Sequence, residues 1–166
     1  MEVGVAGVVR LSRNSLQHVS AEAASSPRLR RNRNLHAMED PVHRLFNAIE
    51  PGSYIRPHRH LRPPKTETMV VVAGRLGFMS FHDDGSVAER EILDAAGETF
   101  GVDVPAGVWH TFVSLAPGTV VFEAKPGPYV PPSDDDTASW APPEGDPAAR
   151  RLEAGWRNAF TQQAES

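Results

Sequence analysis

Three histidines and a glutamate are the side chains in this chain whose types and spacing could do chemistry. His58 and His60 are two residues apart, so in an extended strand both imidazoles point to one face. Neutral imidazole nitrogens are common ligands of divalent metals, and another histidine with a carboxylate would complete a compact site. His110, just after the turn Pro105-Ala106-Gly107, and Glu67, on an alternating run, supply them. The pattern predicts a metal site with nitrogen and oxygen ligands.

The composition narrows the kind of metal and the chemistry. The 166 residues include no cysteine, so thiolate ligands and thiol nucleophiles are excluded. Iron, zinc, nickel or manganese accepts three imidazoles and a carboxylate, so we expect one divalent transition metal of unspecified identity. Such an ion keeps positions for water or substrate and can polarise a carbonyl or hydroxyl, or bind dioxygen if it is iron.

Further polar residues lie near these ligands. Glu67 is either the fourth ligand or a general base, and Tyr54 and Lys65 are the other candidate acid–base residues. In a continuous strand, Tyr54 and Arg56 share the face of His58. A guanidinium pointing into a small barrel is costly unless it is paired. Arg56 therefore needs a carboxylate partner or an anionic substrate, unless a kink at Pro57 sends it to solvent.

The spacing of these residues resembles the two motifs of the cupin superfamily. Gly52 is followed by five residues and His58, and Glu67 by six residues and Gly74. The second motif, Pro-x-Gly followed by two residues and a histidine, ends at His110. Two features depart from the usual pattern: the six residues between His60 and Glu67 form a long gap, and Ser114 stands where an asparagine is frequent.

A closer resemblance, to the WbuC-type cupin-fold metalloproteins, covers most of the chain from Ser26 to Glu144. The segments that carry it include residues 26–30, 34–36, 44–48, 53–60, 109–111, 125–129 and 140–144. The resemblance implies one cupin barrel with a bound metal, and a link to the surface-polysaccharide (O-antigen) gene clusters for which the family is named. It also favours a role in substrate binding near the mouth for Glu123, Lys125 and Tyr129.

The pattern of β-like runs predicts an all-β fold. Short runs broken by turn residues every 8–12 positions are typical of a small antiparallel β-barrel or jelly roll. Strands are expected at 34–38, 43–48, 54–56, 68–73, 75–82, 87–93, 99–104, 109–115 and 119–125. The expected organisation is an N-terminal arm with a short helix at 16–25 (residues 1–32), a single cupin domain with the metal site (33–130), and a proline-rich wrap with a helix at 147–162 (131–166).

Charge and hydropathy exclude several classes of partner. A net charge of −4 argues against general binding to nucleic acid or to anionic membranes. The apolar run at 3–9 is too short for a membrane span or a signal peptide, so the cytoplasm is the expected location. The arginines between 28 and 33 predict a solvated linker. The alternative is that they bind phosphate or a sugar acid. The apolar stripe of the last helix predicts docking on its own barrel, and a homodimer contact is the alternative.

The leading functional hypothesis is an enzyme for a small polar metabolite. The resemblance favours a sugar or nucleotide-sugar derivative, with isomerase, epimerase or lyase chemistry by metal-assisted proton transfer. An iron-dependent dioxygenase and a non-catalytic binding protein for a small ligand are the alternatives, because a fold alone does not decide among these reactions.

Overall fold

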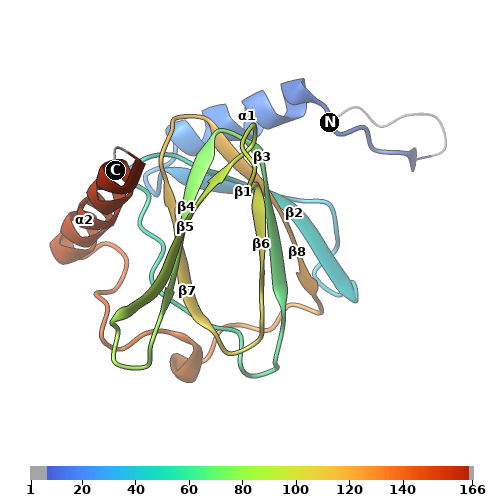
Figure 1. Cartoon of the computed structure of the whole chain (residues 1–166). Helices are drawn as coiled ribbons and strands as arrows, with labels where there is room; N and C mark the ends of the chain where they lie inside the picture. The colour runs from blue at the N-terminus through green and yellow to red at the C-terminus, as the bar shows by residue number, and fades with distance from the viewer. Residues whose placement is uncertain (1–6, 165–166) are drawn as a thin grey trace.

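Two antiparallel sheets packed face to face form the body of the protein (Figure 1). The computed structural model describes residues 7–164, in which the strands are β1 (Arg30–Asn34), β2 (Val42–Ile49), β3 (Glu67–Ala73), β4 (Arg75–Phe81), β5 (Val87–Asp94), β6 (Gly101–Val104), β7 (Trp109–Ser114) and β8 (Thr119–Pro126). One sheet has the order β1-β2-β8-β3-β6 and the other β5-β4-β7. This jelly-roll arrangement confirms the predicted all-β fold.

Strand alternation separates an inner from an outer face in the five-stranded sheet. In β3 the side chains of Glu67, Met69 and Val71 are buried, and Met69 and Val71 join the core between the two sheets. Leu76 and Phe78 of β4 and Phe112 of β7 enter the same core from the other sheet. The predicted ligand Glu67 is therefore at the end of the buried face of its strand.

Two helices cover outer faces of the sheets. The helix α1 (Arg13–Ala24) packs Val19 and Ala23 on the outer face of the larger sheet, next to Phe46. It begins three residues before the expected start, because the Ser12 hydroxyl accepts a hydrogen bond from the backbone N–H of Ser15 and caps the helix there. None of the helices in residues 7–164 is sufficiently long and apolar to cross a membrane.

The helix α2 (Pro147–Ala164) docks on the outer face of the smaller sheet, as the apolar stripe predicts. Figure 1 shows it beside β4 and β5. Phe160 is 1% exposed and shares a core cluster with Met79, Val113 and the half-buried Trp156. The ring of Phe160 lies directly over Gly77, where β4 carries no side chain.

Gly77→Val is expected to destabilise the protein by about 1–3 kcal/mol, the usual cost of forcing extra volume into a packed core. A Cβ at Gly77 would lie 2.5 Å from the Phe160 ring, so α2 must shift outward. The measurement is urea unfolding. Gly155→Ala is the matched control, since its Cβ meets nothing within 4 Å, and alanine in a helix should raise stability by up to about 1 kcal/mol. Equal stability of Gly77→Val and the parent chain would contradict this account of the docking.

The structure corrects the sequence-based expectation in three segments. The arginine-rich stretch predicted as a linker is the strand β1, whose Arg30 pairs in register with Ile49 of β2. The strand expected at 34–38 is absent, and the strand expected at 54–56 is an irregular segment. There the carbonyl oxygens of Tyr54 and Ile55 accept hydrogen bonds from the side chains of Arg30 and Thr111, in place of strand partners. The predicted N-terminal arm begins in residues 1–6, which lie outside the described residues.

Candidate metal centre

Four predicted ligands, separated by up to 52 positions in the sequence, meet at one point. One donor atom from each of His58, His60, Glu67 and His110 lies within 4.8 Å of the others. Backbone pairing fixes two of them: the N–H of His58 donates to the His110 carbonyl at 3.0 Å, and the N–H of His110 donates back at 2.9 Å. These two bonds hold the irregular segment that carries His58 against β7. Glu67 is the first residue of β3.

The histidine rings are oriented by backbone carbonyl groups. Nδ1 of His58 lies 3.1 Å from the carbonyl oxygen of Arg56, and Nδ1 of His110 lies 2.9 Å from that of Val108. A ring nitrogen that faces a carbonyl oxygen must carry the proton, so in the neutral rings Nε2 is left with its lone pair. Carbonyl groups commonly hold metal-binding histidines in this way.

The contact between His110 and Glu67 is the best test of whether a metal fits. Nε2 of His110 lies 3.1 Å from a carboxylate oxygen of Glu67, although Nδ1 already donates to a carbonyl. A neutral imidazole has one N–H, so it cannot donate at both nitrogens. Within the described part of the chain, the buried Nε2 of His60 also has no hydrogen-bond partner. A cation among these atoms satisfies all of them, so the residues fit a divalent metal.

Glu67 is the charged centre of the group. Its side chain is 4% exposed, and besides His110 it contacts Nε2 of His60 at 3.5 Å and Nζ of Lys125 at 3.0 Å. Burial by itself raises the pKa of a carboxyl group, but the close imidazoles of His110 and His60 and the charge of Lys125 outweigh it. The pKa of Glu67 is held well below its usual value, so the carboxylate is ionised and able to ligate.

Burial keeps His58 in the neutral form that a metal ligand needs. Burial, and after it the neighbouring His110, lowers the pKa of His58 to about 3. In the unfolded chain the imidazole takes up a proton near pH 6.5. The unfolded state therefore binds more protons below that pH, and the folded state loses stability as the pH falls.

The free energy of unfolding of metal-free protein is expected to decrease between pH 7 and pH 5 because of His58. The measurement is urea unfolding at several pH values in this window, with His58→Leu as the comparison. The variant should show a shallower decrease, since it has no imidazole to protonate on unfolding. Parallel curves for the two proteins would contradict a His58 that stays neutral in the folded state.

Two cavities meet at the histidines. The first, of about 250 Å³, reaches Glu67 along the inner face of the larger sheet. The second, of about 340 Å³, contains Arg56, His60 and Lys65 and is walled by the C-terminal segment. Both cavities are lined by His43, Ile55, His58, Lys125 and Tyr129. The candidate ligands are thus reached from two directions.

The predicted substrate residues on β8 and after it face the first cavity. Glu123 and Lys125 line it, and Lys125 contacts both Glu123 and Glu67. Burial, and then the negative charge of Glu67, raises the pKa of Glu123 to about 7. Tyr129 is 52% exposed and lines both cavities, so its ring is available at the mouth.

The predicted acid–base residues are placed differently from one another. Lys65 lines the second cavity, where its Nζ donates to the Pro128 carbonyl at 2.7 Å. The Tyr54 hydroxyl donates to the Pro142 carbonyl at 2.8 Å, and burial raises the pKa of Tyr54 to about 12. Tyr54 therefore anchors the C-terminal segment. The expected common face of Tyr54 and His58 is wrong, because this segment is irregular: Ile55, not Tyr54, lines the cavities with His58.

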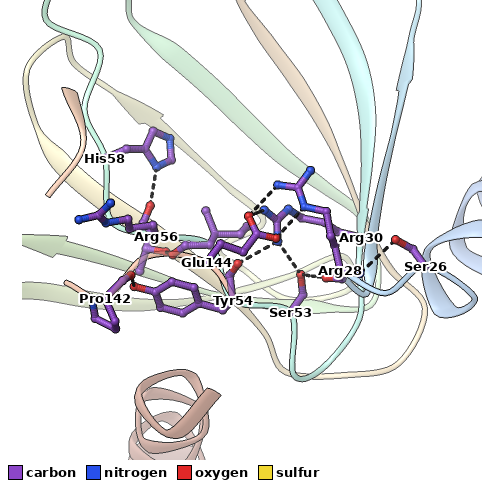
Figure 2. A network of polar contacts seen from close by, with 11 residues as sticks. Ser26, Arg28, Arg30, Ser53, Tyr54, Arg56, His58, Pro142 and Glu144 are labelled. Atoms are coloured by element: carbon purple, nitrogen blue, oxygen red, sulfur yellow. Dashed lines mark hydrogen bonds and ion pairs between the residues drawn. The ribbon is translucent and has the colours of Figure 1, made fainter. Parts of the chain in front are cut away.

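Glu144 is a residue that the sequence analysis missed. Figure 2 shows it between Arg28 and Arg30, in contact with both, at 2.6 and 2.7 Å. Hydrogen bonds from Arg28 and Arg30 hold the pKa of Glu144 at about 2. Arg30 also donates to the Tyr54 carbonyl, so the network ties the C-terminal segment to the chain just before His58. Nothing in the sequence connects residues 114 positions apart.

The fold and the site together define a cupin-fold protein with a His/Glu group able to hold a metal. Among solved structures, CapF in complex with 3-isopropenyl-tropolone is 19% identical (TM-score 0.50, 60% of this chain and 28% of CapF). Procruciferin, an 11S globulin from Brassica napus, is 13% identical (TM-score 0.50, 63% and 27%). KdgF from Halomonas sp. is 19% identical (TM-score 0.49, 67% and 87%). The likenesses to CapF and procruciferin show the fold alone.

The chain belongs to the family described as "Domain of unknown function (DUF6016)", whose model matches residues 11–93, half of the chain. That match includes His58, His60 and Glu67 and ends before His110. No match was found among curated proteins. The resemblance to WbuC-type proteins stays a prediction.

Proposed function

We propose that this protein is a metal-dependent enzyme that acts on a small anionic, hydroxylated metabolite such as a sugar acid or a nucleotide-sugar derivative. Isomerase, epimerase or lyase chemistry is the class that fits best. One observation carries the proposal: His58 and His60 of the candidate ligand group line the same cavity as Arg56, whose guanidinium has no carboxylate partner among the described residues. The resemblance to WbuC-type proteins supports a sugar and a place in surface-polysaccharide biosynthesis.

Arg56 is the basis for an anionic substrate. Its Nη2 donates to the Ala138 carbonyl at 2.7 Å, and its Nε is buried with no partner among the described residues. Lys125, in contrast, is paired with Glu67 and Glu123. An unpaired guanidinium at such a site is expensive, and a carboxylate or phosphate would satisfy its planar pair of donors.

The residues around the histidines suit proton transfer on such a substrate. A divalent ion bound by the group would polarise a substrate carbonyl or hydroxyl. Glu67 is occupied by two imidazoles and Lys125, which favours its role as ligand over its role as base. Lys65 lines the second cavity and Glu123 the first, and either can exchange a proton with a bound substrate. Tyr54, engaged with Pro142, is less suited to that role.

The test combines a substrate panel with the variant Arg56→Lys. Protein of known metal content is incubated in D₂O with hexuronic acids, aldonic acids and nucleotide sugars, and NMR follows deuterium incorporation and new products. We expect deuterium at a carbon next to a carbonyl, and binding weakened about 10- to 100-fold in Arg56→Lys, since lysine has no planar fork. Arg90→Lys on the exposed strand β5 is the matched control.

Three outcomes would contradict parts of the proposal. Oxygen consumption with any substrate would move the assignment to an iron-dependent dioxygenase. Binding without turnover across the panel would leave a non-catalytic binding protein. Unchanged binding of every anion in Arg56→Lys would remove the anionic substrate.

A further inference from the structure

Three asparagines on the inner face of the larger sheet take no part in the function proposed above. Asn32 and Asn34 alternate along β1, and Asn47 on β2 is the cross-strand partner of Asn32. All three line the first cavity, the one that ends at Glu67. We call Asn32, Asn34 and Asn47 the amide wall. Asn32 and Asn34 are exposed at the mouth of the cavity, and Asn47 is half-buried further inside.

The amide wall and the metal ligands belong to one continuous surface. Cross-strand partners on the inner face run from Asn47 to Val121 of β8, and from Leu45 to Glu123 and on to Met69 of β3. Neighbouring strands are about 4.8 Å apart, so β2, which carries Asn47, is roughly 10 Å from β3, which carries Glu67. The space between them is a cavity of about 250 Å³. Drug-sized ligands occupy about 300–1,000 Å³, so this space suits a smaller molecule, of the size of one sugar.

The amides have hydrogen-bonding capacity that the protein does not use. The Oδ1 of Asn47 is buried and has no partner in residues 7–164. Nδ2 of Asn34 contacts the thioether of Met38 at 3.7 Å, and this sulfur is a weak acceptor. Buried polar groups in native proteins are almost always paired. The unpaired Oδ1 of Asn47 therefore indicates a hydrogen-bond partner that enters the cavity from outside.

The chemistry of the wall indicates which part of a ligand it meets. An asparagine amide accepts at its oxygen and donates at its nitrogen, and a pair of neighbouring hydroxyl groups does both in return. Among the described residues that line this cavity, the permanent cation is Lys125, and it is paired with Glu67 and Glu123, so the amide end is not built for a carboxylate or phosphate. Met69 and Phe112 form apolar surface between the wall and Glu67 and can contact the C–H face of a sugar.

We propose that the amide wall is a subsite for the hydroxylated carbon chain of a sugar or sugar acid whose reacting end lies at His58, Glu67 and His110. This inference rests on the proposed function and deepens it, because it makes a polyhydroxylated substrate a requirement. Asn47 is then a specificity-determining residue, and Asn32 completes the contact at the mouth.

The experiment compares three probes by calorimetry with protein as purified, at known metal content. D-Gluconate and D-glucuronate carry a hydroxylated chain, and glycolate is an α-hydroxy acid without one. We expect Asn47→Leu to weaken both sugar acids by about tenfold or more, since a hydrogen-bonded ligand group would be left unpaired. Glycolate should bind Asn47→Leu and the parent chain alike. The fold should tolerate the change, because leucine replaces an unsatisfied amide of similar size.

Two further variants make the result decisive. Asn32→Ala, at the exposed mouth, gives the same comparison even if Asn47→Leu fails to fold. Asn158→Leu, on the exposed side of α2, is the matched control and should change nothing. Unchanged sugar-acid affinity in both Asn47→Leu and Asn32→Ala overturns the subsite and leaves ordered water as the partner of Asn47. A parent chain that binds neither sugar acid also overturns it. The affinity of Arg56→Lys for glycolate tests the proposed function separately, because glycolate carries the anionic group but no hydroxylated chain.

Discussion

The double variant His58→Ala/His60→Ala is expected to bind no divalent metal, where the parent chain binds about one ion. These residues supply two of three imidazoles whose donor atoms meet within 4.8 Å. Two ligands, Glu67 and His110, remain in the variant, and two are too few to hold a transition metal against water. The single variant His110→Ala keeps three ligands, and its affinity for the metal should be severely reduced.

The measurement is elemental analysis of protein prepared without a histidine tag, after dialysis against a weak chelator. The double variant His18→Ala/His82→Ala is the matched control, because both of these histidines are exposed and neither is near the group. The control should retain full metal content. Full occupancy in His58→Ala/His60→Ala would refute the site.

Glu67→Gln is expected to lower metal affinity by at least about tenfold, the scale on which even outer-shell partners of metal ligands act. One carboxylate oxygen of Glu67 contacts Nε2 of His60 and the other contacts Nε2 of His110, so the carboxylate lies where a fourth metal ligand is needed. Glutamine keeps the shape of the side chain but loses its charge, and Lys125 is left with Glu123 as its only carboxylate in the described structure.

Metal titration and turnover together separate the two roles of Glu67. Metal content unchanged with turnover lower by about 10²–10⁴ would make Glu67 a general base instead of a ligand. No change in either would place it outside the site. Glu89→Gln on the exposed strand β5 is the control for the loss of one negative charge.

Local patterns in the sequence were sufficient to predict the main elements of the fold. The alternation through Glu67, Met69 and Val71 places the glutamate on the buried face, because side chains in a strand repeat every two residues. The apolar stripe with Phe160 predicts a helix docked on the barrel for a similar reason, with a period near 3.6. Histidines 52 positions apart were joined only through the resemblance to cupins, since spacing alone carries no such distant contact.

Local patterns failed where distant segments supply the partners. The stretch from Arg30 to Asn34 has the composition of a solvated linker, yet it is a strand because β2 offers it a register of backbone hydrogen bonds. The segment from Tyr54 to Arg56 is predicted as a strand, yet its carbonyl oxygens accept hydrogen bonds from the side chains of Arg30 and Thr111. Strand propensity depends strongly on such surroundings.

The sequence by itself determined the all-β class, the docked terminal helix and the residues able to bind a metal, because these depend on periodicity and residue chemistry. The tertiary structure decided what surrounds those residues. It brought Lys125 and Glu123 to Glu67, left Arg56 without a carboxylate partner among the described residues, and set the amides of Asn32 and Asn47 along the same cavity. Each of these contacts joins strands or loops far apart in the chain, and only the packing of the two sheets fixes which side chains face one another.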